Sequence, residues 1–178
     1  FVSNLDGYFV VKSSDQLAVN LIGKLFESPS RDLTLTGDIN IQNPSINMLA
    51  DIRESQLKES IPFLNNSSFS LTSARVSGKA RLLSNSFNIN DFNLSGTLDI
   101  KDMEALLFGQ RLRAKNFQMK FDGHTMYLPE AQGTVEEGLF SISGNLGTIF
   151  HPEINLAVDF ENYAAKSLMI SAPILELL

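Results

Sequence analysis

The stretch Phe92-Asn93-Leu94-Ser95-Gly96-Thr97-Leu98-Asp99-Ile100 carries the strongest structural signal in the chain. Apolar side chains recur at every second position, and polar side chains lie between them. This period of two is typical of a β-strand that buries one face and exposes the other. The single interruption of the apolar face is Gly96.

The same alternation recurs along most of the sequence and predicts a mainly antiparallel all-β fold. The clearest further strands are expected at 33–41, 117–121, 140–146 and 154–160, and others at 5–12, 17–26, 69–82 and 126–135. Turn-forming residues separate them, at 27–30, 65–68, 84–86, 122–124 and 150–152. We therefore expect an elongated, curled sheet with an apolar concave face and a few short helices.

Two segments are expected to be those helices. Residues 46–60 place Met48, Leu49, Ile52 and Leu57 on one side, and Pro62 would stop the helix. Residues 101–108 could form one or two helical turns before Gly109.

Glycine occupies one recurring setting, apolar–x–Gly–x–apolar. This setting holds seven of the eleven glycines: Gly7, Gly23, Gly37, Gly78, Gly96, Gly133 and Gly144. Alternation places each of them on the apolar face of its strand. Glycine weakens a strand interior, so its recurrence needs a physical reason. Either it permits a bend or bulge that coils the sheet, or it lets a neighbour approach the backbone closely.

Composition limits the classes of function. The 178 residues fit one domain, the chain contains no cysteine, and its net charge is −6. Nucleic-acid binders usually carry a basic patch, whereas the longest basic cluster here is Arg111, Arg113 and Lys115 on one expected strand face. No apolar run reaches the roughly 18 residues of a membrane span. Both ends read as cuts through a longer protein, so we expect 1–178 to be one segment of it.

Catalytic and metal-binding patterns are missing from the sequence. His124 and His151 lie beside turn signals without a second ligand at a recognised spacing. Glu136 and Glu137 form a carboxylate pair at a turn before Gly138. Adjacent strand residues point to opposite faces and do not work easily as an acid–base pair, so we interpret the pair as part of a solvated turn. We expect a non-enzymatic protein without cofactor or metal.

Several stretches resemble the C-terminal region of AsmA-like bacterial envelope proteins. They are the runs 94–100, 110–121, 138–146 and 171–178, together with Gly133, and the resemblance spans about residues 20–178. It implies a long curled antiparallel sheet with an apolar inner surface. It also implies a periplasmic location, a parent protein anchored in the inner membrane, and a role in conducting phospholipid or supporting outer-membrane assembly. The family has no catalytic residues to carry over.

An apolar sheet face must be covered, either by a second sheet or by curling into a trough that holds acyl chains. For the trough, the expected lining is Leu94, Leu98, Phe117, Met119, Phe121, Phe140, Ile142, Leu156 and Val158. The expected partners are phospholipid acyl chains and the rest of the parent chain, with no nucleic acid. The alternative is an extracellular or surface β-sandwich for binding or adhesion, and a jelly-roll enzyme is a third reading that lacks convergent polar residues.

Overall fold

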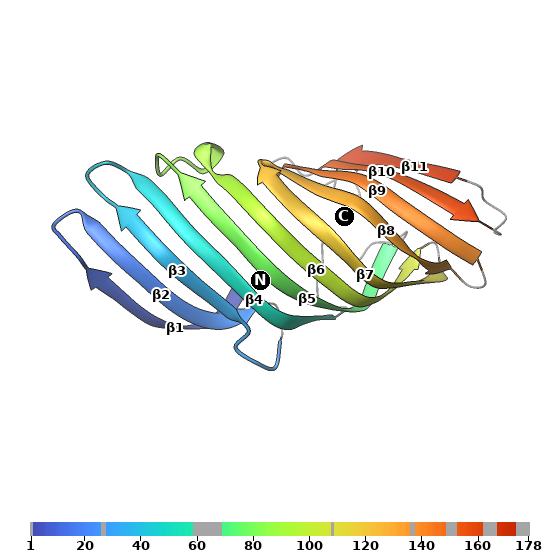
Figure 1. Ribbon diagram of the computed structural model, residues 1–178, viewed down its shortest axis with the longest axis horizontal. Coiled ribbons are helices and arrows are strands. Elements are labelled where there is room, and N and C mark those ends of the chain that lie inside the picture. Colours follow the sequence, from blue (N-terminus) through green and yellow to red (C-terminus); the bar gives the residue numbers. More distant parts are fainter. Residues whose placement is uncertain are drawn as a thin grey trace.

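The fold is one antiparallel sheet of eleven strands that lie side by side in chain order (Figure 1). A computed structural model describes residues 2–25, 28–58, 69–107, 109–135, 138–148, 153–161 and 167–173. The strands are β1 (Val2–Val11), β2 (Gln16–Leu25), β3 (Leu33–Asn40), β4 (Ser45–Lys58), β5 (Phe69–Ser84), β6 (Asn93–Leu107), β7 (Gln110–Gly123), β8 (Thr125–Val135), β9 (Gly138–Thr148), β10 (Glu153–Glu161) and β11 (Ser167–Pro173). A short 3₁₀ turn, η2 (Ile89–Asp91), precedes β6.

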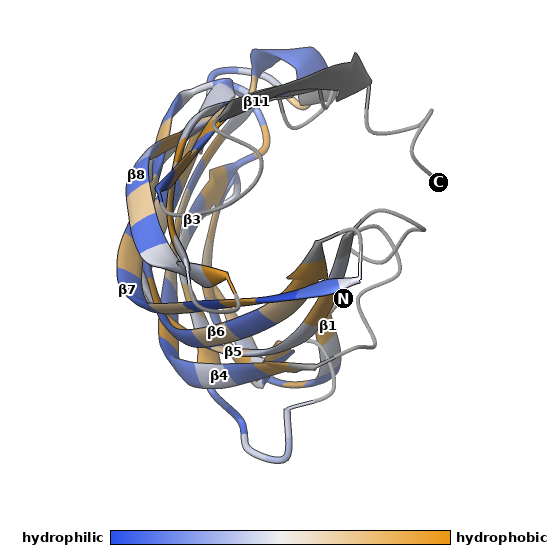
Figure 2. Ribbon diagram, turned by 90° about the vertical axis from the view of Figure 1, so that its right-hand side faces the viewer, coloured by the Kyte–Doolittle hydropathy of each residue, from blue (hydrophilic) through white to orange (hydrophobic). Residues whose placement is uncertain are grey.

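Viewed along its length, the sheet has a C-shaped profile that is open on one side (Figure 2). The predicted elongated, curled antiparallel sheet is therefore confirmed. Every strand predicted by alternation is present, and the turns expected at 84–86 and 122–124 connect strands. The turn signals at 65–68 and 150–152, and Pro62, lie outside the described residues.

The curl follows from polar doublets that interrupt the alternation in five neighbouring strands. At each doublet the side chains of two successive residues point to the outer face. The inward residues on either side of the doublet are therefore three positions apart instead of two. The doublets are Arg53-Glu54, Thr72-Ser73, Lys101-Asp102, Lys115-Asn116 and Pro129-Glu130. Each gives the outer face of its strand one residue more than the inner face. A strand with a longer outer face bends inward, as β-bulges generally bend their strands.

The two predicted helices are wrong, and the doublets explain why. Residues 46–58 belong to β4 and residues 101–107 to β6. The steps from Ile52 to Ser55 and from Ile100 to Met103 imitate helical spacing, because a doublet inserts one outward residue. Backbone φ angles of 49° at Glu54 and at Asp102 mark the bulges themselves.

The core lies on the apolar face, where β4 to β9 contribute one buried cluster. Its members are Leu57, Leu71, Ala74, Val76, Ile100, Ala105, Leu112, Ala114, Val135 and Phe140. Leu98, Met103, Phe117, Ile142 and Phe160 are half-buried against it. Part of the trough is thus filled by the chain's own side chains.

The ladder between β7 and β8 forms only at its two ends. Leu112 and Arg113 pair with Val135 and Thr134, and residues 120–122 pair with 125–127. Pro129 lies in the stretch between these ends and has no N–H to donate to a ladder. An internal strand thereby accommodates a proline.

Candidate binding groove

All nine residues predicted to line a groove lie on the same face of the sheet. Cross-strand register shows this directly, because Leu98 pairs with Met119 and Ile142 pairs with Val158. The nine come from β6 (Leu94, Leu98), β7 (Phe117, Met119, Phe121), β9 (Phe140, Ile142) and β10 (Leu156, Val158). Phe140 and Val158 are buried, and the other seven are half-buried. Whether this lining binds lipid stays a prediction.

The strand β8 lies between β7 and β9 and supplies lining residues that the sequence analysis missed. They are Met126, Leu128, Ala131 and Val135, which join the already predicted Gly133. The strand itself was predicted, but the doublet at Pro129-Glu130 shifts the alternation halfway along it. If that doublet is read as a bulge, alternation before and after it identifies the inward residues of both halves of β8.

The inner face carries no charge on the described strands β1 to β10. Following the register from Gly7 and Leu21 across to Val158 and Phe160, the inward positions hold apolar residues or glycine, apart from the buried Ser55 and Ser84 and the half-buried Gln110. Charged residues occupy the outer face, where Arg113 pairs with Glu104 at 3.0 Å between Nε and Oε1. An uncharged inner surface suits a hydrocarbon ligand and does not suit an ionic one.

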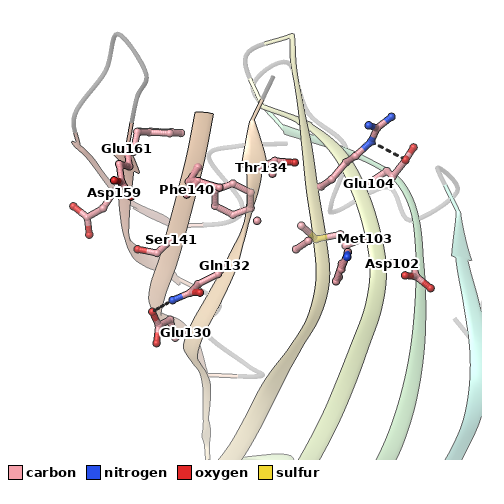
Figure 3. A pocket seen from close by; sticks show the side chains of 16 residues that line it. Asp102, Met103, Glu104, Glu130, Gln132, Thr134, Phe140, Ser141, Asp159 and Glu161 are labelled. Carbon is pink, nitrogen blue, oxygen red and sulfur yellow. Dashed lines mark hydrogen bonds and ion pairs between the residues drawn. The ribbon is translucent and has the colours of Figure 1, made fainter. Parts of the chain in front are cut away.

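One depression in this face has a volume of about 750 Å³ and spans β6 to β10. Its lining includes the inward residues Met103, Ala114, Gly133, Phe140 and Phe160. The flanking, outward-facing positions of the same strands complete the wall, and the charged ones among them are Asp102, Glu104, Arg113, Lys115, Glu130, Asp159 and Glu161. Met103 and Phe140 point toward each other across it, whereas Asp159 points away (Figure 3). The small Ala114 and Gly133 leave the space between the larger side chains.

A second depression of about 750 Å³ lies further along the same strands, toward the β7–β8 turn. Its lining consists of the inward residues Gly96, Phe121, Leu128 and Gly144 together with their outward-facing neighbours Lys120, Asp122, Tyr127, Pro129, Ser143 and Asn145. Large side chains of Leu98, Phe117 and Ile142 lie between the two depressions in the strand sequences. The groove therefore has two hollows with an apolar ridge between them.

The predicted position of the repeated glycines on the concave apolar face is confirmed. At Gly96 an added Cβ would lie 2.2 Å from the Lys79 carbonyl oxygen, and at Gly144 it would lie 2.1 Å from that of Asn155. Their φ angles are 142° and 146°, which L side chains rarely adopt. Glycine in these strands was attributed either to a bend or to close approach of a neighbour. At both positions the backbone of a neighbouring strand approaches closely.

The remaining candidate residues do not form a site. His124 is exposed in the turn between β7 and β8, and His151, Glu136 and Glu137 lie outside the described residues. Across the described ranges, no three His, Cys, Asp or Glu side chains are grouped to hold a metal. That same part of the chain contains no helix with the length and hydrophobicity of a membrane span.

The comparisons with known proteins give no relative for this chain. No protein-family model matches it, and neither does any curated protein or solved structure.

Proposed function

We propose that this chain is a non-enzymatic module that shields or conducts phospholipid acyl chains along its concave face. The observation that carries the proposal is the uncharged inner face, with its two hollows, on a sheet that is curled but open. The resemblance of several stretches to AsmA-like proteins points the same way. On that basis we place the chain in the periplasm, as part of a longer protein anchored in the inner membrane that supports the outer membrane.

Hydrocarbon burial supplies the driving force in this proposal. Each buried CH₂ contributes about 0.8 kcal/mol, so a chain of roughly sixteen carbons would gain on the order of 12 kcal/mol before losses of mobility. Such a gain needs no specific polar contact. The lipid headgroup would remain outside the groove, because no described inward side chain could neutralise its charge.

The adhesion alternative has less support from the architecture. All described strands belong to a single sheet, and no second described sheet covers its apolar face. A β-sandwich needs two such sheets. We therefore retain the groove as the proposed function.

Photo-crosslinking tests the proposal at single-residue resolution. A photoreactive residue at Met119 or Ile142 would face the groove, whereas one at Gln118 or Ser143 would face outward. The purified chain is mixed with vesicles of phosphatidylethanolamine and phosphatidylglycerol and then irradiated. We expect phospholipid adducts at the two inward positions only. Adducts at neither face, or equally at both, would contradict an acyl-binding groove.

A matched pair of charge substitutions tests the same point without a photoreactive residue in the chain. Met119→Lys places an ammonium in the groove, and Gln118→Lys places one on the outer face of the same strand. We expect Met119→Lys to abolish binding of a fluorescent acyl-chain probe and Gln118→Lys to leave it unchanged. Circular dichroism of both variants verifies that the sheet is retained. Equal binding by both folded variants would count against the groove.

A further inference from the structure

The two hollows of the groove run side by side across the strands. Cross-strand pairs show this, because each pair joins two residues of the same hollow on neighbouring strands. The first hollow is crossed by the pairs Met103–Ala114, Gly133–Phe140 and Phe140–Phe160. The second hollow is crossed by the pairs Gly96–Phe121 and Leu128–Gly144. With neighbouring strands about 4.8 Å apart, the first hollow extends roughly 19 Å over β6 to β10 and the second roughly 14 Å over β6 to β9.

Side-chain size explains why this face has two hollows and not one. Each hollow contains two inward positions with little or no side chain, and they are Ala114 and Gly133 in the first and Gly96 and Gly144 in the second. A ridge separates them, formed by the large side chains of Leu98, Phe117 and Ile142 on β6, β7 and β9. On β9, Ile142 lies midway between one residue of each hollow, and these residues are four positions, or about 13 Å, apart. A straight hydrocarbon chain that fills one hollow therefore leaves the other empty.

We propose that each hollow holds one acyl chain of the same lipid, so that the groove selects two-chain phospholipids over lipids with a single chain. This inference rests on the proposed function. The two hollows have the same volume, about 750 Å³ each, which lies within the roughly 300–1,000 Å³ of small-molecule sites. The described inward positions carry no charge on either side of the ridge, as two hydrocarbon chains require. The glycerol that joins the chains would cross above the ridge, on the open side of the C-shaped profile (Figure 2).

Two joined chains would bind more tightly than one chain alone. Once the first chain occupies its hollow, the second is held close to the other hollow at a high effective concentration, so its binding becomes intramolecular. A single-chain lipid lacks this advantage and leaves the apolar lining of the other hollow in contact with water. We expect phosphatidylglycerol with two palmitoyl chains to bind at least tenfold more tightly than lysophosphatidylglycerol with one palmitoyl chain.

Native mass spectrometry of the complete 178-residue chain counts the bound lipids. At saturation, and below the concentrations at which these lipids form micelles, we expect one two-chain lipid or two single-chain lipids per protein chain. Saturation with only one single-chain lipid, or with two two-chain lipids, would overturn the assignment of one chain to each hollow, while acyl-chain shielding would stand. Failure of the folded chain to bind either lipid would contradict the proposed function, and this inference with it.

Filling one hollow at a time tests the assignment further. Met103 and Phe121 are half-buried inward residues, one in each hollow, so Met103→Trp narrows the first hollow and Phe121→Trp the second. Gln118→Trp is the matched control, because Gln118 is exposed on the outer face of β7 and lines neither hollow. We expect each narrowed variant to bind one single-chain lipid and to lose the tenfold preference for two chains, and the control to keep both properties. Circular dichroism verifies folding, and a folded Met103→Trp or Phe121→Trp variant that keeps the preference would overturn the inference.

Discussion

At the scale of single residues, Gly96 and Gly144 show how little space separates neighbouring strands. The nearest obstacle to a side chain at either position is a backbone carbonyl of the adjacent strand, which cannot rotate away as a side chain could. Alanine should therefore be excluded as well as larger residues. The close approach explains why glycine recurs at equivalent places in a strand interior, where it would otherwise be unfavourable.

We predict that Gly96→Ala or Gly144→Ala lowers the free energy of unfolding by at least about 2 kcal/mol, since overpacking and backbone strain add. Urea unfolding followed by circular dichroism measures the change. Gly109→Ala is the control: its φ is also positive, at 80°, but an added Cβ meets nothing within 4 Å. That variant should lose only about 1 kcal/mol from strain. Similar losses at all three positions would refute the steric explanation.

Asp32 is the one described buried carboxylate, 3% exposed before the start of β3. Burial opposes its ionisation, but the Ser28 hydroxyl, the Leu25 N–H and the Ser55 hydroxyl together lower its pKa below the ordinary 3.8. Its Oδ1 accepts the Leu25 N–H at 3.0 Å, and its backbone carbonyl accepts the Arg53 N–H at 2.8 Å. The residue thus joins the β2–β3 loop to β4.

The pH dependence of Asp32 has a definite sign. A folded-state pKa below the unfolded value stabilises the fold above pH 3.8, and this contribution disappears as the pH falls through the folded-state pKa. We predict that Asp32→Asn lowers the free energy of unfolding at pH 7 by about 1–2 kcal/mol. The difference from the unmodified chain should shrink below pH 4, as measured by urea unfolding across the pH range. A constant difference would contradict the assignment.

At the scale of elements, the bulge at Glu54 can be tested with two glycine substitutions that are expected to change stability in opposite directions. Glu54 has a φ of 49°, a conformation that disfavours residues with a Cβ, whereas Gln56 is an outward residue of the same strand after the bulge. Glycine should relieve strain at position 54 and weaken the strand at position 56. We predict that Glu54→Gly is at least as stable as the unmodified chain, and that Gln56→Gly loses about 1 kcal/mol. Thermal unfolding compares the two, and equal losses would argue against a bulge there.

The bulges also define how far the sequence could predict this fold. Regular alternation identified nine of the strands, because their apolar faces follow the period of two for several residues, as in 92–100 and 154–160. It failed at 46–58 and 101–107, where one extra outward residue gives a helical spacing. The nine lining residues could be placed on one face from alternation alone. The hollows could not, because they depend on which small residues, such as Ala114 and Gly133, become neighbours across strands.

At the scale of the whole molecule, stability should vary from strand to strand. Each described strand contacts mainly its sequence neighbours, and the buried cluster lies on β4 to β9. Arrays with such nearest-neighbour contacts open locally at their ends. We predict that amide hydrogens of β1 exchange through local opening, at least tenfold faster than those of β5 and β6, in hydrogen–deuterium exchange of the dilute chain. Uniform protection across the sheet would indicate one cooperative unit.

The chain-order arrangement of the strands has a mechanical consequence. A tensile load applied across the two ends would reach the hydrogen bonds of the outermost strand first, because each strand is tied to the next by a ladder in sequence order. The hydrogen-bonded ladders would then break one after another, instead of all carrying the load together in shear. Such a sheet would extend at low force in hairpin-sized steps and recoil in the reverse order. It would act as a compliant tether between whatever structures hold its two ends.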